Sequence, residues 1–510
     1  MMFLTLFSKK KNFLQEIVTL KFNIMTIKDL KPSLVWSIFD EITKVPRPSK
    51  KEEKIREYLV DFAHKHNLAV KTDAIGNVVM SKPATPGKED APGIILQAHM
   101  DMVCESNDKS FDFENNPITT IIDGEWVQAD GTTLGADNGI GMAGALAALV
   151  DDTLVHGPLE ALFTVDEETG LTGANNLGEG MISGTILLNL DSEDDAEIFV
   201  GCAGGVDTTC TFTYTTESAP AGYHYFKVTV VNGCGGHSGC DIHLGRANAN
   251  KLLARFIWSI AKKHDVVIAE IEGGNLRNAI PRAASAVIGV PAVAKEDVRI
   301  AMNNYSAVIE NEYKGVEPNL SVDLESADAP AQCIDKTTAM NLINALYCAP
   351  HGVISMSREL EGLVETSTNL AAIKMLPNNE ILVTTSQRSS VDSRKWDIAN
   401  QVETVFALAG AKVTHGDGYP GWAPNMQSPI MEIARDAYKE LYGITPAIKA
   451  IHAGLECGLF LQKYPYLDMV SFGPTLQGVH SPTERMHIPA VERFWGQLTR
   501  VLEKVADLKR

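Results

Sequence analysis

The stretch ALFTVDEETGLTGA, residues 161–174, places two adjacent glutamates where an apolar segment ends. Its first part, Leu162–Val165, has the β-branched and aromatic character of a short interior strand. In α/β proteins, ligands bind beyond the carboxyl ends of such strands. An acidic pair alone is typical of a solvated loop, so Glu167 and Glu168 indicate a functional site only if other reactive side chains converge on them.

The sequence around this stretch alternates between predicted helices and strands. Residues 93–103, 159–166 and 185–193 are apolar runs that predict buried strands, whereas 139–150 predicts a helix. This alternation indicates an α/β sheet. After Gly201 the pattern changes to two-period strands separated by long helices, which predicts an α+β module. Helix and strand alternate again in the last part of the chain.

The middle module is interpreted as an insertion into one domain that is built from both ends of the chain. Two of its segments, 277–290 and 366–385, each lead from an Asn-containing stretch into a strand, which suggests two similar halves. Met25 opens an amphipathic helix pattern, so the residues before it are interpreted as an extension. The predicted segments are the N-terminal extension, 1–24, the first part of the outer domain, 25–205, the inserted domain, 206–400, and the second part of the outer domain, 401–510.

The composition argues against several classes of partner. The formal net charge is -19 and no basic stripe is present, which argues against nucleic acid. No apolar run has the length that a bilayer span requires, so we expect no membrane partner. The eight cysteines are scattered at low density, which is typical of reduced thiols in a cytoplasmic protein.

Four further segments deliver a histidine or a carboxylate into a polar or Gly-rich loop. They contain His99 and Asp101, Asp137, Asp191, and His480. The candidate ligands are two imidazoles and three carboxylates. They are His99, His480, Asp137, Glu168 and Asp191, a mixed set that suits zinc, manganese or cobalt better than calcium. With one carboxylate bridging, five side chains can hold two ions about 3.5–4 Å apart, as in two-metal hydrolases.

The spacing of the residues assigns further roles. His99 and Asp101 point to the same face of an extended strand, so Asp101 can fix the tautomer of His99. Adjacent residues that leave a strand point in different directions, so Glu168 can bind metal while Glu167 faces the space above it. Glu167 would then be the general base for a metal-activated water.

Other patterns in the sequence suggest different functions, but each of them is incomplete. Gly139–Gly144, GIGMAG, fits a dinucleotide-binding motif but lacks the apolar strand that should precede it. Cys234, His237 and Cys240 lie close together but lack the other half of a zinc-binding set. No G-x-S-x-G motif supports a serine hydrolase. A catalytically inactive relative on the same fold would have lost the base, and Glu167 is present.

The motifs HMD, GADNG, DEETG, NLDSE and GVHSP occur in this order, and with them the chain resembles the M20 metallopeptidases. The longer motifs DGTTLGADNGIG, GGHSGCDI, GGNLRNAIP, ETSTNLA and HAGLECG are similar to the aminoacyl-histidine dipeptidase branch of that family. The resemblance runs from about Met25 to the C-terminus. It implies an α/β fold with a mixed-sheet di-zinc catalytic domain and an inserted α+β lid domain.

The resemblance also implies roles for individual residues in metal binding. His99 and Asp191 would bind one ion, Glu168 and His480 the other, and Asp137 would bridge them. Glu167 matches the general base of the family and Asp101 its orienting aspartate. Asn138 stands where many relatives have a second aspartate, and it is assigned no ligand role.

Four residues resemble those that recognise the substrate in the family. His237 would stabilise the oxyanion, Asn278 and Arg388 would hold the substrate carboxylate, and Gly454 would form part of the pocket. A guanidinium pairs well with a carboxylate, and a donor aimed at a developing oxyanion stabilises the transition state.

We therefore expect a cytoplasmic metallopeptidase that hydrolyses unblocked dipeptides, including carnosine-like Xaa-His dipeptides. Its cofactors would be two divalent metal ions, in the first place zinc, with cobalt or manganese as alternatives. The alternative function is another hydrolase of the same family, such as an aminoacylase or a tripeptidase. The expected partners are small peptides, and a homodimer in which lid residues act across an interface stays open beside a monomer.

Overall fold

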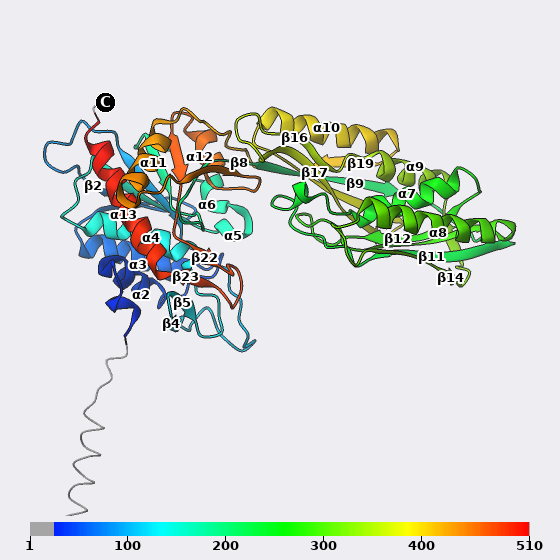
Figure 1. The fold of residues 1–510 in the computed structure, drawn as a ribbon, viewed down its shortest axis with the longest axis horizontal. Coiled ribbons are helices and arrows are strands. Elements are labelled where there is room, and N and C mark those ends of the chain that lie inside the picture. The colour runs from blue at the N-terminus through cyan, green and yellow to red at the C-terminus, as the bar shows by residue number, and fades with distance from the viewer. Residues whose placement is uncertain (1–24, 509–510) are drawn as a thin grey trace, which may run out of the picture.

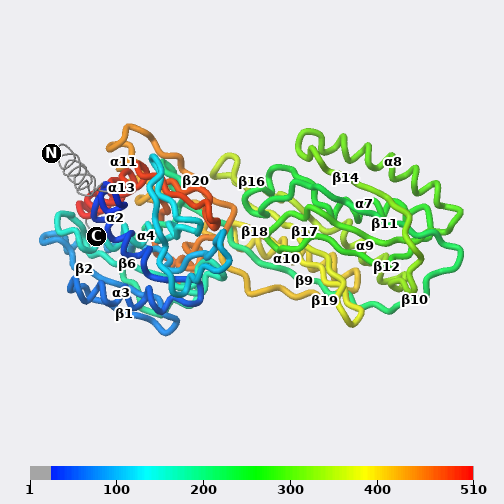
Figure 2. The backbone as a smooth tube through the Cα atoms, turned by 90° about the horizontal axis from the view of Figure 1, so that it is seen from below, coloured from blue at the N-terminus to red at the C-terminus, as the bar shows by residue number. Residues whose placement is uncertain are grey.

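The computed structural model describes residues 25–508, so the predicted extension, residues 1–24, lies outside the described residues. Two bodies lie side by side along the long axis of the molecule (Figures 1 and 2). One is built on an eight-stranded sheet and the other on a nine-stranded sheet, and we call them the eight-stranded and the nine-stranded body. The eight-stranded body contains strands from both ends of the chain, as an insertion requires.

The eight-stranded sheet is mixed. Its strands, in spatial order, are β1 (Ala69–Thr72), β2 (Val78–Lys82), β6 (Leu159–Thr164), β3 (Ile94–His99), β7 (Ile186–Asn189), β21 (Asp468–Ser471), β8 (Glu197–Cys202) and β20 (Ala447–Ile451). The central strands β6, β3, β7 and β21 pair in parallel. Every residue of β3, β6 and β7 is buried, which explains their nearly continuous apolar sequences.

Helices cover both faces of this sheet. Alternate strand residues, such as Ile94 and Ile95, belong to two different cores. The helices that contribute to the larger core are α2 (Ser33–Ile42), α3 (Glu53–Lys65), α4 (Ala136–Val150), α11 (Pro429–Tyr442) and α13 (Ile488–Ala506). The short helices α6 (Thr172–Asn175) and α12 (Cys457–Lys463) contribute to the other core.

A small four-stranded sheet joins the two ends of the chain beside the larger sheet. It contains β4 (Thr120–Asp123), β5 (Trp126–Ala129), β22 (Leu476–Gln477) and β23 (Arg485–His487). The hairpin of β22 and β23 encloses the loop that carries His480. The pairing of β23 with β5 therefore brings this loop next to the N-terminal part of the chain.

The nine-stranded sheet consists of two modules with the same topology. One module runs β11 (Tyr223–Val231), α7 (Ala249–Ala261), β12 (Val267–Gly273), β13 (Ala284–Pro291), α8 (Lys295–Glu312) and β14 (Ser321–Ala327). The other runs β9 (Gly204–Thr213), α9 (Lys336–Cys348), β17 (Val364–Leu376), β18 (Glu380–Ser389), α10 (Asp392–Leu408) and β19 (Lys412–His415). The spatial orders β14-β11-β13-β12 and β19-β9-β18-β17 are equivalent, and both are ferredoxin-like.

The first module is inserted into the second, between β9 and α9. A ribbon of β10 (Thr216–Ser218) and β15 (Gln332–Ile334) pairs where the chain enters and leaves it, and β16 (Gly352–Met356) pairs with β17. The segments 277–290 and 366–385, which the sequence suggested as similar, are equivalent only in part. The first contains most of β13, the third strand of its module. The second contains most of β17, the second strand of the other module, and the start of β18, its third strand, because Asn-rich turns do not specify a strand's place in a sheet.

The α/β fold with a mixed sheet and an inserted α+β part is thus confirmed. All four long helices of the nine-stranded body share one core with its strands. Within residues 25–508, none of the helices combines the length and the apolar character needed to cross a membrane.

Candidate metal centre and substrate junction

His99 is the last residue of β3, at the carboxyl end of a fully buried strand. Its Nδ1 lies 3.2 Å from Asp101 Oδ1, although this contact is not aligned as a hydrogen bond. Its Nε2 lies 3.1 Å from Asp137 Oδ1 and 3.4 Å from Asp191 Oδ1. As the sequence suggested, Nδ1 of His99 therefore faces Asp101, and Nε2 faces the candidate ligands Asp137 and Asp191.

Asp101 also holds the segment that carries the two glutamates. Its carboxylate accepts hydrogen bonds from the backbone N–H groups of Glu167, at 3.0 Å, and Glu168, at 3.3 Å. The Ser49 hydroxyl donates a third hydrogen bond at 2.8 Å. One buried carboxylate thus contacts both His99 and the start of the short helix α5 (Glu167–Gly170), which sets the glutamates beside the histidine.

Asp137 lies between the two histidines. It is placed at the start of α4, where its backbone angles and those of Asn138 are not helical. Its Oδ1 faces His99, and its Oδ2 lies 3.1 Å from His480 Nε2. The two oxygens of one carboxylate therefore face two different imidazoles, which is the arrangement expected of a bridging ligand.

Glu168 completes the second group of candidate ligands. Its Oε1 lies 3.0 Å from His480 Nε2, and its side chain is almost fully buried. His480 itself is half-exposed and has a φ of 61°, a left-handed conformation that is uncommon for a residue with a side chain. The ligand atoms of Asp137, Glu168 and His480 lie within 4.8 Å of one another, as do those of His99, Asp137 and Asp191.

These five side chains fit a pair of divalent cations. The Nε2 atoms of His99 and His480 each lie within 3.4 Å of two carboxylate oxygens, and such close acceptors need a proton or a cation between them. Hydrogen bonds to Asp137 and Glu168 raise the pKa of His480 to about 11. Burial lowers the pKa of His99, but the nearby carboxylates, Asp191 foremost, raise it well above its usual value. Metal ions would take the place of these protons.

Glu167 has a different environment from its neighbour. One of its carboxylate oxygens lies within 4.8 Å of the ligand atoms of His99 and Glu168. Burial raises the pKa of Glu167 well above its usual range, with His99 opposing this shift and Asp191 adding to it. A buried carboxyl group with a raised pKa beside candidate metal ligands is typical of a group that exchanges protons with a substrate or a water molecule.

The four predicted substrate-binding residues gather at the junction between the two bodies. Two of them, His237 and Asn278, lie on adjacent loops, and the Ser238 N–H donates to the Asn278 carbonyl at 2.8 Å. The other two contact Tyr419: Arg388 Nη1 donates to its hydroxyl at 3.1 Å, and Gly454 packs against its ring.

A single loop connects this junction with the candidate metal ligands. At one end, His452 Nε2 lies 2.7 Å from the Ser367 hydroxyl of the nine-stranded body. At the other end, Glu456 Oε2 accepts hydrogen bonds from Gln97, at 2.6 Å, and Thr164, at 2.8 Å, behind His99. Among residues 25–508, no direct hydrogen bond or ion pair joins the four junction residues to the five candidate ligands.

The tautomer of His237 follows from its neighbours. Its Nδ1 accepts hydrogen bonds from the backbone N–H groups of Gly239, at 3.2 Å, and Cys240, at 3.1 Å. Burial lowers the pKa of His237, and the charge of Arg388 adds to this effect. The imidazole is therefore neutral, with its proton on Nε2, which is free to donate.

Comparison with known proteins places this geometry in a family. Residues 95–505, which contain every candidate ligand and every junction residue, match peptidase family M20/M25/M40. The chain belongs to this family. The prediction of an M20 metallopeptidase is therefore confirmed.

Individual relatives of this M20 peptidase were also found. The chain is 45% identical to the cytosol non-specific dipeptidase of Escherichia coli, over 94% of this chain and 99% of the relative. The structure of the aminoacylhistidine dipeptidase from Vibrio alginolyticus is similar, with a TM-score of 0.90, 44% identity, and coverage of 96% and 99% of the two chains. A tripeptidase from Staphylococcus aureus is 16% identical with a TM-score of 0.55, covers 94% and 100%, and shows a shared fold alone.

The structure of this M20 peptidase adds residues that the sequence did not single out. Glu484 is buried, and its carboxylate accepts hydrogen bonds from four successive backbone N–H groups at 2.7–3.3 Å, those of Leu134, Gly135, Ala136 and Asp137. The buried guanidinium of Arg47 donates to the carbonyls of Met100, Asp101 and Gly135. These two side chains hold the loops that present Asp101 and Asp137.

Asn138 and Glu456 support the cluster from behind. The Asn138 amide donates to Asp191 Oδ1 and accepts from the Gly141 N–H at 3.1 Å, so Asn138 orients a candidate ligand. Glu456 is fully buried, and burial, aided by Asp191 and opposed by His99, raises its pKa to about 8. The sequence offered a signal for both residues: Asn138 stands next to Asp137, and Glu456 lies in the motif HAGLECG, although no role was assigned to it.

The competing motifs of the M20 peptidase have structural explanations. A side chain at Gly141 would meet Asn138 Oδ1 at 2.0 Å, and one at Gly144 would meet Phe494 at 2.9 Å, so the glycines of GIGMAG allow close packing of α4. Cys234 and Cys240 belong to none of the groups in which at least three ligand atoms cluster within residues 25–508.

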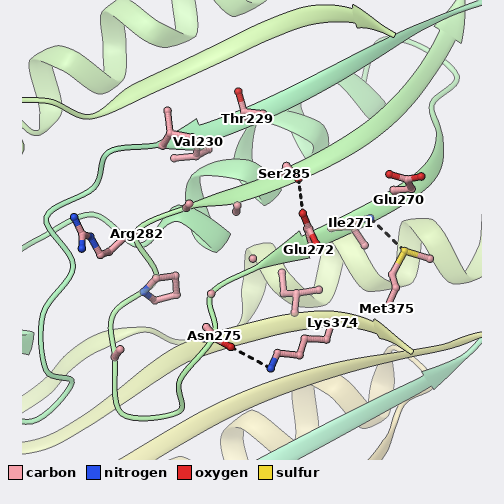
Figure 3. Close-up of a pocket in the computed structure, with 18 of the residues that line it drawn as sticks. Thr229, Val230, Glu270, Ile271, Glu272, Asn275, Arg282, Ser285, Lys374 and Met375 are labelled. Atoms are coloured by element: carbon pink, nitrogen blue, oxygen red, sulfur yellow. Dashed lines mark hydrogen bonds between the residues drawn. The ribbon is translucent and has the colours of Figure 1, made fainter. Parts of the chain in front are cut away.

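A groove of about 1060 Å³ lies on the exposed face of the nine-stranded sheet (Figure 3). Its lining mixes acidic and basic side chains, among them Glu270, Glu272 and Lys374. Ser285 donates to Glu272, and Lys374 donates to Asn275, each at 3.4 Å. Both hydrogen bonds are drawn as dashed lines in Figure 3. None of the candidate ligands or junction residues lines this groove.

Proposed function

We propose that this M20 peptidase is a cytoplasmic di-metal dipeptidase that hydrolyses unblocked dipeptides, Xaa-His dipeptides among them. The observation that carries the proposal is the position of Asp137, whose two oxygens face His99 and His480 separately. The substrate class is supported by the names of two relatives, a cytosol non-specific dipeptidase and an aminoacylhistidine dipeptidase.

The five clustered side chains are the proposed ligands. His99 and Asp191 would hold one ion, Glu168 and His480 the other, and Asp137 both. Zinc is the first choice and cobalt or manganese the alternatives, because all three accept mixed nitrogen and oxygen ligands. Bound divalent cations supply positive charge that lowers the pKa of water and stabilises a developing oxyanion.

Glu167 is the proposed general base. It would take a proton from the attacking water and pass it to the leaving nitrogen of the peptide. Its position supports this role, because its backbone N–H is held by Asp101 while its carboxylate has no hydrogen bond among residues 25–508. The raised pKa of this carboxyl favours the protonated form that the second transfer needs.

His237 and Arg388 are proposed to recognise the substrate. The Nε2–H of neutral His237 would donate to the oxyanion, an interaction that strengthens as the peptide carbonyl is attacked. Arg388, with Asn278, would hold the terminal carboxylate of the dipeptide. Both roles require the junction and the metal cluster to face one substrate, and the loop from His452 to Glu456 that spans them supports this.

Substrate profiling tests the proposal. The metal-reconstituted enzyme is expected to hydrolyse β-alanyl-histidine and other free dipeptides, and the metal-depleted enzyme is not. N-acetylated dipeptides and tripeptides should be poor substrates. A preference for N-acyl amino acids would indicate an aminoacylase instead, and a preference for tripeptides a tripeptidase. Full activity in a preparation that elemental analysis shows to be free of metal would overturn the metal-dependent mechanism.

A further inference from the structure

The chain crosses between the two bodies through paired segments. Cys202 and Gly205 lie on the outgoing crossing, and Tyr419 and Trp422 on the returning one. The Gly205 N–H donates to the Tyr419 carbonyl at 3.1 Å, and the Tyr419 N–H donates to the Gly205 carbonyl at 2.8 Å. The backbone of Tyr419 is therefore fixed at the connection.

The ring of Tyr419 occupies a slot between two glycines. A Cβ atom added at Gly205 would lie 2.7 Å from the Tyr419 hydroxyl oxygen, and one added at Gly454 would lie 2.8 Å from Cε2 of the ring. Side chains at either position would displace the ring. The Tyr419 carbonyl also accepts a hydrogen bond from the buried ammonium of Lys395 at 2.7 Å, which further restricts this residue.

Arg388 has an unusual environment for a buried guanidinium. Its residue exposure is 8%, yet no carboxylate within residues 25–508 forms an ion pair with it. Its one side-chain hydrogen bond in this part of the chain goes from Nη1 to the Tyr419 hydroxyl, and its buried Nε has no partner there. A buried cation without a counter-ion is costly, so the guanidinium is prepared to receive an anion.

We infer that Tyr419 is a positioning residue for Arg388, and that Gly205 and Gly454 are required because they seat its ring. The hydroxyl of Tyr419 would fix the direction of the guanidinium, so that the donors left free meet the terminal carboxylate of a dipeptide. Gly454 would then act on the substrate through Tyr419 and Arg388. This inference rests on the proposed role of Arg388 in substrate binding.

The substitution Tyr419→Phe tests the inference, because it removes the hydroxyl and keeps the ring in its slot. The KM for free dipeptides is expected to rise about tenfold, which is the effect of losing one hydrogen bond to a charged group, while kcat changes less than about twofold. The thermal midpoint should stay unchanged. Tyr464→Phe is the matched control, because its hydroxyl donates to the Gly178 carbonyl at 3.3 Å, away from Arg388. This control should leave KM unchanged.

A double-mutant cycle separates positioning from direct contact. Arg388→Ala should raise KM strongly, and adding Tyr419→Phe to it should raise KM no further. An equal effect of Tyr419→Phe in both backgrounds would mean that Tyr419 acts independently of Arg388, and an unchanged KM in the single variant would likewise overturn the inference. If Arg388→Ala itself left KM unchanged, the proposed function of Arg388 would fail instead.

Discussion

Glu167 and Glu168 are neighbours in the sequence, yet they occupy different environments. The Glu168 carboxylate contacts His480, whereas the Glu167 carboxylate stands beside the cluster with a raised pKa. Both backbone N–H groups donate hydrogen bonds to the Asp101 carboxylate, whereas the two side chains point in different directions. The proposed base, Glu167, and the proposed ligand, Glu168, are thus separated by one peptide unit.

The substitution Glu167→Gln should abolish turnover and spare metal binding. The amide keeps the size of the side chain but cannot accept a proton, and a general base contributes about 10²–10⁴ to the rate. We expect kcat to fall by about this factor, with two metal ions still bound per chain by elemental analysis. Wild-type turnover in this variant would exclude Glu167 as the base.

Glu168→Gln is the informative contrast, since it alters a proposed ligand. It should reduce both bound metal and activity, because a neutral amide is a weaker ligand than a carboxylate. Glu179→Gln, at an exposed position, should change neither quantity.

Glu456 makes the stability of the metal-free enzyme depend on pH. Its pKa is about 8 in the folded protein, against an ordinary value of 4.5, so the folded state binds the proton more tightly. Its stabilising contribution is complete below about pH 4.5 and is lost as the pH rises to about 8. Urea unfolding of the metal-free protein measures this effect. Between pH 5 and pH 8, the free energy of unfolding should fall by a few kcal/mol less in Glu456→Gln than in the wild type.

The amide of Glu456→Gln can keep both hydrogen bonds that the carboxyl group accepts from Gln97 and Thr164. Its oxygen replaces Oε2, which accepts from Gln97 and Thr164, and its NH₂ takes the place of the unpaired Oε1. A loss of stability that matches wild type over the whole pH range would show that Glu456 does not titrate there.

At the scale of elements, the start of α4 is held by a distant carboxylate. The two oxygens of Glu484 accept from four backbone N–H groups of the segment 134–137, which ends at Asp137. The amide of Glu484→Gln can accept with only one oxygen, and its NH₂ would face two N–H donors. Buried donors left without acceptors cost about 1–3 kcal/mol each.

We expect Glu484→Gln to lower the free energy of unfolding by about 3 kcal/mol and to weaken metal binding, since Asp137 loses its support. Chemical unfolding and metal titration measure these two effects. Glu492→Gln, an exposed glutamate on α13, is the control and should show neither effect. Normal metal affinity in a destabilised Glu484→Gln would show that the loop position does not depend on this carboxylate.

The contrast between Asp137 and Glu484 explains what could be predicted from sequence. His99, Asp137, Glu168, Asp191 and His480 each follow a recognisable local pattern, and the structure brings them together. Glu484 lies 347 residues from Asp137, in a polar stretch, TER, that reads as an exposed loop. Its burial depends on the pairing of β22, β23 and β5, which no local periodicity specifies. Arg47 was missed because its partners, the carbonyls of Met100, Asp101 and Gly135, are also distant in the sequence.

The elements themselves were easier to predict than their order in space. The strand with His99 and the helix after Asp137 follow from apolar periodicity, and β3 and α4 are found where it placed them. The two similar modules of the nine-stranded sheet were predicted, but the segments suggested for them correspond only where β13 and the start of β18 each form the third strand of a module, because long-range pairing decides strand order. Sequence similarity between modules is weak where only topology is shared.

At the scale of the whole molecule, the two bodies have separate hydrophobic cores. The larger core of the eight-stranded body contains residues from Ile27 to Val200 and from Ile430 to Val505. The core of the nine-stranded body contains residues from Cys210 to Phe406. All five proposed ligands lie on strand ends, loops and helix starts of the eight-stranded body, so metal binding should stabilise that body alone.

Calorimetry with and without metal tests this separation. We expect two thermal transitions, of which only one moves when zinc is removed by a chelator and restored by adding zinc back. A ligand present at a thousandfold excess over its Kd stabilises by about 4 kcal/mol, which for a domain of this size is a shift of roughly 10 °C. His480→Ala removes a ligand of only one of the two proposed ions, so it should reduce the zinc-dependent shift and leave the other transition in place. A single transition that moves as a whole would mean that the two cores unfold as one cooperative unit, with the paired crossings at Gly205 and Tyr419 coupling them.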